Sequence, residues 1–127
     1  MRVLIVDDEP HVMRVLELTL TRAGYRVLCV TDGSAALDSV RLHAPDVLIT
    51  DIQMPVMNGR ELCEAIHAEF PARSFPILVM TSGTARENRE WASRIPNTDF
   101  LEKPLSPRNL IARLDAYREG LARCVPT

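Results

Sequence analysis

The chain has 127 residues, of which 46% are hydrophobic and 25% are charged, so its size and composition suit one domain with one hydrophobic core. The formal net charge is -2 and the 15 lysine and arginine residues are scattered, which argues against direct nucleic-acid binding. No apolar run approaches the roughly 20 residues that span a membrane, and the apolar N-terminus is too short for a signal peptide.

The first half of the chain alternates apolar runs with helical patterns. Runs at 3–6, 26–30 and 47–50 predict three strands, and their continuous apolarity is typical of strands covered on both faces. Between the first two, Pro10 suits the first position of a helix that Gly24 ends. A turn and cap at Asp32-Gly33-Ser34 then opens a second helix.

The second half continues the alternation. After Asn58-Gly59 we expect a third helix that buries Leu62, Ala65 and Ile66. Runs at 77–80 and 99–102 predict a fourth strand and a fifth at the sheet edge. A short helix over 86–94, with Trp91 on its buried side, separates these strands. Ser106 caps a last helix that has Pro107 at its first position.

Strand and helix alternate five times, which predicts an α/β fold: a doubly wound, five-stranded parallel sheet with helices on both faces. We expect one domain over residues 1–127. Ligands of such sheets bind beyond the carboxyl ends of the strands. The chemically interesting side chains all fall at these ends: Asp7, Asp8, Asp51, Thr81 and Lys103.

The chain resembles the receiver domain of bacterial two-component response regulators over nearly its whole length. The resemblance rests on these five residues, on the pairs Met54-Pro55 and Asn58-Gly59, and on Pro104. The resemblance implies a flavodoxin-like (β/α)5 fold with strand order 2-1-3-4-5. It also implies that Asp51 accepts a phosphoryl group from a phosphohistidine, and that slow hydrolysis resets it. The chain would therefore be a phosphoacceptor signalling domain and catalyse only its own phosphorylation and dephosphorylation.

Three clustered carboxylates require compensation, because two unit charges about 4 Å apart repel by roughly 4 kcal/mol at an effective dielectric of 20. Mg²⁺ fits, because it prefers oxygen ligands and works beside phosphate. In the family pattern Asp8, Asp51 and the backbone carbonyl of Gln53 ligate Mg²⁺ directly, and Asp7 acts through water. A carboxylate such as Asp51 can attack phosphorus to give an acyl phosphate.

The resemblance assigns the remaining roles and partners. Lys103 would neutralise charge on the phosphoryl oxygens, and the Thr81 hydroxyl would donate to one of them. The phosphoryl donor would be a sensor histidine kinase or a phosphotransfer protein, and the receiver of the signal an unknown output protein. We expect a monomer, or a weak dimer through the face made by helix four, strand five and helix five. Phe100 occupies the position of the family's switching aromatic residue.

Other interpretations compete with this one. Asp7 and Asp8 could simply cap the first helix, whose start attracts acids. A haloacid-dehalogenase-like phosphotransferase also uses an aspartyl nucleophile, but it requires a second aspartate at the position of Gln53. A receiver-like interaction module that works without phosphorylation usually lacks one of the site residues, and here all are present. A phosphate-binding-loop nucleotidase is excluded by the missing glycine-rich motif.

Two features set further expectations. Pro96-Asn97 stands where the family often has Gly-Ala, and because proline cannot adopt positive φ, the loop before the last strand must differ. Cysteines 29, 63 and 124 are widely spaced and odd in number, which is typical of reduced thiols in the cytoplasm. We therefore expect a cytoplasmic protein without a membrane segment.

Overall fold

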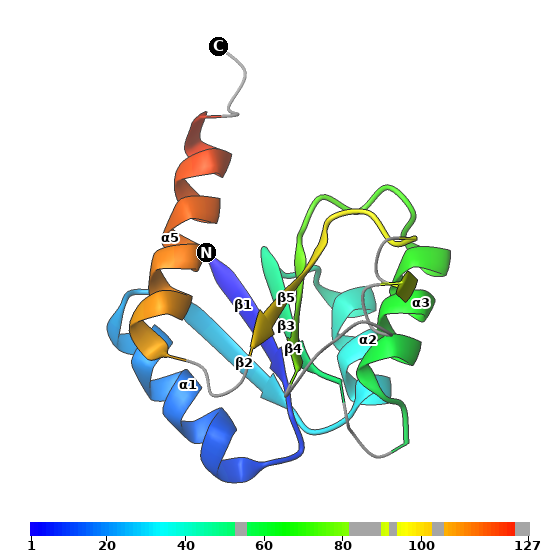
Figure 1. The fold of residues 1–127 in the computed structure, drawn as a ribbon, viewed down its shortest axis with the longest axis horizontal. Helices are drawn as coiled ribbons and strands as arrows, with labels where there is room; N and C mark the ends of the chain where they lie inside the picture. Colours follow the sequence, from blue (N-terminus) through cyan, green and yellow to red (C-terminus); the bar gives the residue numbers. More distant parts are fainter. Residues whose placement is uncertain (53–55, 82–89, 92–93, 103–105, 124–127) are drawn as a thin grey trace.

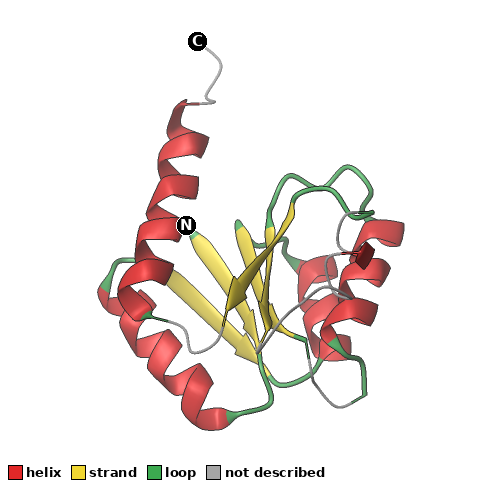
Figure 2. Ribbon diagram, in the orientation of Figure 1, coloured by secondary structure: helices red, strands yellow, loops and turns green. Residues whose placement is uncertain are grey.

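The computed structural model describes residues 1–52, 56–81, 90–91, 94–102 and 106–123. Five parallel strands form one sheet between two layers of helices (Figures 1 and 2). The order of the strands is β2-β1-β3-β4-β5, as the family resemblance implies, with the last strand at an edge. Their bounds are β1 (Arg2–Val6), β2 (Arg26–Val30), β3 (Val47–Asp51), β4 (Ile77–Thr81) and β5 (Thr98–Glu102).

The described helices divide between the two faces of the sheet. Figure 1 shows α1 and α5 on one side and α2 and α3 on the other. Their bounds are α1 (Pro10–Arg22), α2 (Gly33–Leu42), α3 (Gly59–Glu69) and α5 (Pro107–Arg123). Across the part of the chain that the structure describes, every helix is too short or too polar to cross a membrane.

Successive residues of a strand point to opposite faces, so each central strand contributes to two cores. On one face, side chains of the sheet pack against α1 and α5. The buried members of this cluster include Val3, Ile5, Ile49, Leu78 and Met80 from the strands, with Leu16, Leu20, Leu110 and Leu114 from the helices. This arrangement explains why the strands read as continuous apolar runs.

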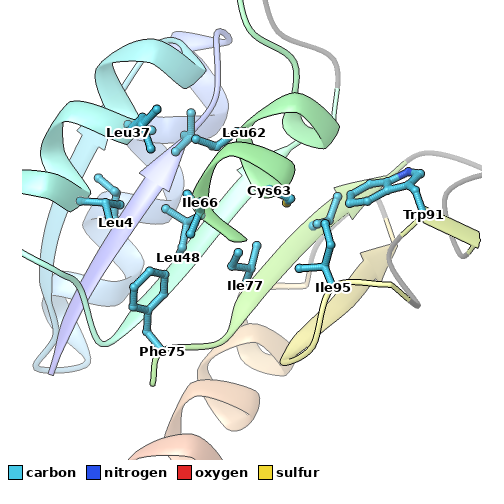
Figure 3. Packing of buried hydrophobic residues seen from close by; sticks show 14 residues of the cluster. Leu4, Leu37, Leu48, Leu62, Cys63, Ile66, Phe75, Ile77, Trp91 and Ile95 are labelled. Atoms are coloured by element: carbon cyan, nitrogen blue, oxygen red, sulfur yellow. The ribbon is translucent and has the colours of Figure 1, made fainter. Parts of the chain in front are cut away.

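The second core lies on the opposite face, against α2 and α3 (Figure 3). Its strand residues are the alternate ones, and its helical residues include two that the sequence assigns to the buried side of α3. Trp91 is also part of it and is 5% exposed, as the sequence predicts. The labelled members are Leu4, Leu37, Leu48, Leu62, Cys63, Ile66, Phe75, Ile77, Trp91 and Ile95.

The predicted starts of the helices are confirmed. Pro10 and Pro107 are the first residues of α1 and α5. The Asp32 side chain accepts a hydrogen bond from the Ala35 N–H at 2.8 Å and so caps α2. Ser106 Oγ accepts from the Asn109 N–H at 3.4 Å. Most of the short helix predicted over 86–94 lies outside the described residues.

The segment before β5 carries Pro96-Asn97, and the structure shows how this pair is accommodated. Asn97, and not Pro96, adopts positive φ (56°). Asparagine tolerates this conformation better than most residues. The guanidinium of Arg73, which lies between α3 and β4, donates to the Pro96 carbonyl and, at 3.1 Å, to the Asn97 carbonyl. Burial lowers the pKa of Arg73. An arginine from a neighbouring loop therefore holds the unusual turn.

Val56 has a strained backbone. Its φ is 68°, and its side chain is 84% exposed, so no packing compensates the conformation. The left-handed region costs a residue with a Cβ atom roughly 1–2 kcal/mol, and a β-branched residue there is an outlier.

We therefore expect Val56→Gly to raise the free energy of unfolding by about 0.5–1 kcal/mol, because relief of strain exceeds the greater entropy of glycine in the unfolded chain. Urea unfolding followed by Trp91 fluorescence measures this change. Val15→Gly is the matched control: Val15 is exposed in α1, where glycine is a poor helix former, so this variant should be less stable. Equal destabilisation by both substitutions would contradict the strain at Val56.

Candidate functional site

Three carboxylates meet at the carboxyl end of the sheet. Asp51 is the last residue of β3, and Asp7 and Asp8 follow directly on β1. These strands are adjacent and parallel, with Val6 opposite Thr50, so the acids are brought together by the register. One carboxylate oxygen from each aspartate lies within 4.8 Å of the others. The sequence prediction that these three residues converge is confirmed.

The three acids differ in exposure. Asp7 is 0% exposed and Asp51 is 5% exposed, whereas Asp8 lies at the surface. Asp7 Oδ1 accepts the Glu9 N–H at 2.9 Å, and Asp51 Oδ1 accepts the Ile52 N–H at 2.7 Å. Hydrogen bonds from the backbone therefore fix the two buried carboxylates, while Asp8 faces solvent.

The alternative that the acid pair only caps α1 does not fit the geometry. The N-cap residue of α1 is Glu9, and its side chain forms no capping hydrogen bond. Asp7 Oδ1 accepts the N–H of this N-cap residue, but a carboxylate oxygen of Asp7 also lies in the cluster with Asp8 and Asp51. Asp7 and Asp8 therefore face the site and do not act as an ordinary helix cap.

Thr81 ends β4, the strand beside β3, and is 4% exposed. It lies one residue beyond Met80, which pairs with Asp51. The structure thus places this hydroxyl-bearing residue at the same edge as the acids. Gln53 and Lys103, the other two predicted site residues, lie outside the described residues, as do Met54, Pro55 and Pro104.

The donor set fits a magnesium ion. Asp7, Asp8 and Asp51 offer only oxygen atoms, and together they carry up to three negative charges within a small volume. A hard dication that keeps some of its waters suits two or three carboxylates at a partly open edge. In a protein of this composition, such a cluster would otherwise be destabilised by its own repulsion.

The start of α3 positions Asp51, and this contact is not apparent from the sequence pattern. The Gly59 N–H donates to the Ile52 carbonyl at 2.9 Å. A Cβ atom on Gly59 would lie 2.3 Å from the Asp51 carbonyl oxygen and 2.8 Å from Ile52 Cα. Only glycine allows α3 to begin so close to the backbone at the end of β3.

A capping box fixes this helix start. Asn58 Oδ1 accepts the Glu61 N–H at 2.8 Å, and the Glu61 carboxylate accepts the Asn58 N–H at 3.2 Å. The spacing of Asn58 and Glu61, three residues apart before an apolar pattern, is the signal in the sequence that could have revealed the cap. The pair Asn58-Gly59 predicts only that the third helix begins after it, not how the helix is capped.

The described thiols do not offer a competing nucleophile. Burial raises the pKa of Cys63 to about 12. Burial, followed by the nearby Glu17 carboxylate, raises the pKa of Cys29 to about 11. Since the thiolate is the reactive form, both cysteines are inert near neutral pH. Cys124 lies outside the described residues.

Comparison with known proteins identifies related chains. A family model described as "Response regulator receiver domain" matches residues 3–115. The alkaline phosphatase synthesis transcriptional regulatory protein PhoP of Bacillus subtilis (strain 168) is 31% identical over 115 residues. That alignment covers 91% of this chain but 47% of PhoP, so the chain spans about half the length of this relative.

Two solved structures resemble the chain closely. The chemotaxis response regulator CheY4 of Vibrio cholerae is 34% identical, with a TM-score of 0.82 and coverage of 91% of this chain and 97% of CheY4. The receiver domain of the sensor histidine kinase PA1611 from Pseudomonas aeruginosa PAO1 is 30% identical, with a TM-score of 0.80 and coverage of 91% and 95%. The PA1611 structure is described with a magnesium ion coordinated in its active site cleft.

We expect Gly59→Ala to lower the free energy of unfolding by about 1–3 kcal/mol, the usual cost of overpacking, and to shift the Asp51 and Ile52 amide resonances. The added methyl group would clash with backbone, which cannot turn away as a side chain can. Gly24→Ala is the matched control, because Gly24 has φ 95° but nothing within 4 Å of an added Cβ atom. It should lower stability through backbone strain and leave the Asp51 resonance in place. An unmoved Asp51 resonance in Gly59→Ala would contradict the positioning role.

Proposed function

Because the chain belongs to the family of response regulator receiver domains, we propose that it accepts a phosphoryl group on Asp51 in a Mg²⁺-dependent reaction and then changes conformation to control a partner protein. The observation that carries this proposal is the convergence of Asp7, Asp8 and Asp51 at the carboxyl edge of the sheet. Receiver domains act in two-component signalling, and their partners are histidine kinases and output domains.

In the proposed reaction, a carboxylate oxygen of Asp51 attacks the phosphorus of a phosphohistidine. The new P–O bond gives an acyl phosphate, while the P–N bond breaks and its electron pair stays on the departing imidazole, which takes up a proton. Water later hydrolyses the acyl phosphate and restores the carboxylate. The hydrogen bond from the Ile52 N–H to Asp51 Oδ1 would orient the nucleophile.

The metal would be held by Asp8, Asp51 and the backbone carbonyl of Gln53, with Asp7 acting through water. The magnesium ion in the cleft of the related PA1611 receiver supports this assignment. When bound, Mg²⁺ supplies positive charge that compensates the carboxylates and the phosphoryl oxygens. Lys103 would add a second positive charge there, and the Thr81 hydroxyl would donate to a phosphoryl oxygen.

Thr81 also connects the site to Phe100. Thr81 pairs with Glu102 across β4 and β5, and Phe100 lies two residues earlier, so both side chains face the α3 side of the sheet. The half-buried Phe100 ring packs edge-on against Trp91, with ring centroids 6.1 Å apart and an angle of 79°. A Thr81 hydroxyl drawn to the phosphoryl group would leave space for Phe100 to turn inward.

This switch is proposed as a shift between two populated states. A change from 1:99 to 99:1 requires about 5.5 kcal/mol of differential interaction. One hydrogen bond contributes about 0.5–1.5 kcal/mol, so Thr81 and Phe100 alone give only part of that free energy. We therefore propose an incomplete switch in the isolated chain.

The proposed setting follows from the family. The phosphoryl donor is a sensor histidine kinase or a phosphotransfer protein, and the output protein is unknown. Residues 1–127 act as one receiver domain in the cytoplasm, without direct contact to nucleic acid, as a monomer or as a weak dimer through the helix four, β5 and α5 face. The chain catalyses only its own phosphorylation and slow dephosphorylation.

We expect Asp8→Asn to weaken Mg²⁺ binding by at least about tenfold, which corresponds to the loss of roughly 1.4 kcal/mol from one charged ligand. A Mg²⁺ titration followed by backbone amide shifts measures the affinity. Glu9→Gln is the matched control, because it removes the next acid along the chain, which is not in the carboxylate cluster of the described residues. Equal affinities for Asp8→Asn and the wild type would show that the metal site is misassigned.

We expect Asp51→Asn to abolish phosphorylation, because the amide cannot act as the nucleophile. The protein is incubated with a small acyl phosphate and Mg²⁺, and intact mass spectrometry measures the fraction that carries one phosphoryl group. Asp46→Asn, at the opposite end of β3, keeps an acceptor oxygen for the Arg2 N–H and should be phosphorylated like the wild type. An unchanged phosphorylated fraction in Asp51→Asn would place the nucleophile elsewhere.

A third variant in the same experiment separates phosphorylation from switching. Thr81→Ala should carry the phosphoryl group on Asp51 but change the fluorescence of Trp91, the single tryptophan, less than the wild type does. A full fluorescence response in Thr81→Ala would refute the coupling. A wild-type chain that accepts no phosphoryl group in Mg²⁺ would instead favour an interaction module that works without phosphorylation.

A further inference from the structure

A cavity lies at the opposite end of the sheet from the aspartates. It has a volume of about 420 Å³ and opens between β1, β2 and the end of α2. This volume falls within the roughly 300–1,000 Å³ that is usual for small-molecule sites. Its lining consists of Arg2, Val3, Leu4, Arg26, Val27, Leu28, Ser39, His43 and Pro45. None of these residues takes part in the phosphoacceptor site.

The cavity combines an apolar floor with a basic rim. Arg2 and Arg26 are directly opposite each other in the β1–β2 register, and so are Leu4 and Leu28. Because alternate residues share a face, all four side chains point to the α2 side of the sheet. Leu28 is 49% exposed although it lies on this face, so α2 does not cover the edge strand completely here.

The two arginines are not neutralised by neighbouring carboxylates. Within the described residues, neither guanidinium forms an ion pair. Asp46 is close by, but its Oδ2 accepts the backbone N–H of Arg2, at 2.7 Å. The Nη1 atom of Arg2 is buried and has no hydrogen-bond partner among the described groups. Buried donors are normally satisfied, so the Arg2 guanidinium keeps hydrogen-bonding capacity that no described group uses.

Two features oppose an anion at this place: the Asp46 carboxylate, which accepts the Arg2 N–H, carries one negative charge, and the end of α2 adds a fraction of one. The cavity lies at the carboxyl end of α2, where the aligned peptide dipoles amount to about half a negative charge. Arg2 and Arg26 supply two full positive charges on the same side. The balance is positive, and the Ser39 hydroxyl and the His43 ring add hydrogen-bonding groups at the rim.

We propose that this cavity, defined by Arg2, Arg26, Leu28, Ser39 and His43, binds a small organic anion that carries one oxyanion group on an apolar body. The oxyanion bonds the two guanidinium groups, and the apolar part lies on Leu28 and its neighbours. Carboxylates and phosphate monoesters share this chemistry. Binding at this cavity does not require phosphorylation of Asp51, so either proposal can be refuted without refuting the other.

The test is a titration of the full chain with phenyl phosphate in Mg²⁺-free buffer, followed by backbone amide shifts. Saturable shifts are expected at Arg2, Leu28 and His43, with an affinity that falls as salt is added. Benzoate and inorganic phosphate are titrated in parallel. Tighter binding of benzoate than of phenyl phosphate would identify a carboxylate site. Inorganic phosphate should bind more weakly than phenyl phosphate, because it lacks the apolar part.

Two variants at exposed positions test the assignment without disturbing the core. Arg26→Gln should weaken phenyl phosphate binding by about tenfold, the loss expected for one charge-assisted hydrogen bond. Leu28→Glu should abolish it, because the new carboxylate repels the ligand. Arg22→Gln is the matched control, since Arg22 is an exposed arginine of α1 outside the cavity. The proposal is overturned if Arg26→Gln behaves like this control, if no saturable shift occurs, or if the shifts gather at Asp7, Asp51 and Thr81.

Discussion

The crowding of three carboxylates at one edge of the sheet is the constraint on which the site depends. Asp7 and Asp51 cannot move apart, because the β1–β3 register is fixed by buried side chains on both faces. A slip of one residue would turn every apolar side chain to the wrong face. Two hydrophobic cores therefore hold together charges that repel by several kcal/mol. Binding of a cation, or neutralisation of one carboxylate, relieves this repulsion.

The start of α3 restrains the position of Asp51, in addition to the restraint from the strand register. Gly59 contacts the Asp51 backbone so closely that no side chain fits between them. The capping box of Asn58 and Glu61 then fixes where the helix begins. The amino end of α3 thus lies beside the backbone of Asp51. A packed glycine and a helix cap therefore hold the Asp51 backbone in place.

The sequence predicts the elements and the convergence of Asp7, Asp8 and Asp51 because both follow from general rules: apolar periodicity and the common edge of parallel strand ends. It does not predict the contact of Gly59, because a steric limit between two segments depends on their distance. Likewise, Pro96 indicates that the loop before β5 must differ, but only the structure shows that Asn97 adopts positive φ and that Arg73 holds it. The roles of Gln53 and Lys103 stay predictions from the resemblance.

The two ends of β1 carry opposite charge, Arg2 at one and Asp7 at the other. Five residues of extended strand separate them by roughly 16 Å, about twice the screening length of about 8 Å at physiological salt. Direct electrostatic coupling between the cavity and the aspartates is therefore weak. The ends of helix α2 lie near both regions: Gly33 at its start is close to Met57 in the segment that follows β3, where a Cβ atom would lie 2.7 Å from the Met57 carbonyl oxygen. Ser39 lines the cavity near its other end. Helix α2 therefore reaches from the cavity to the segment that follows β3.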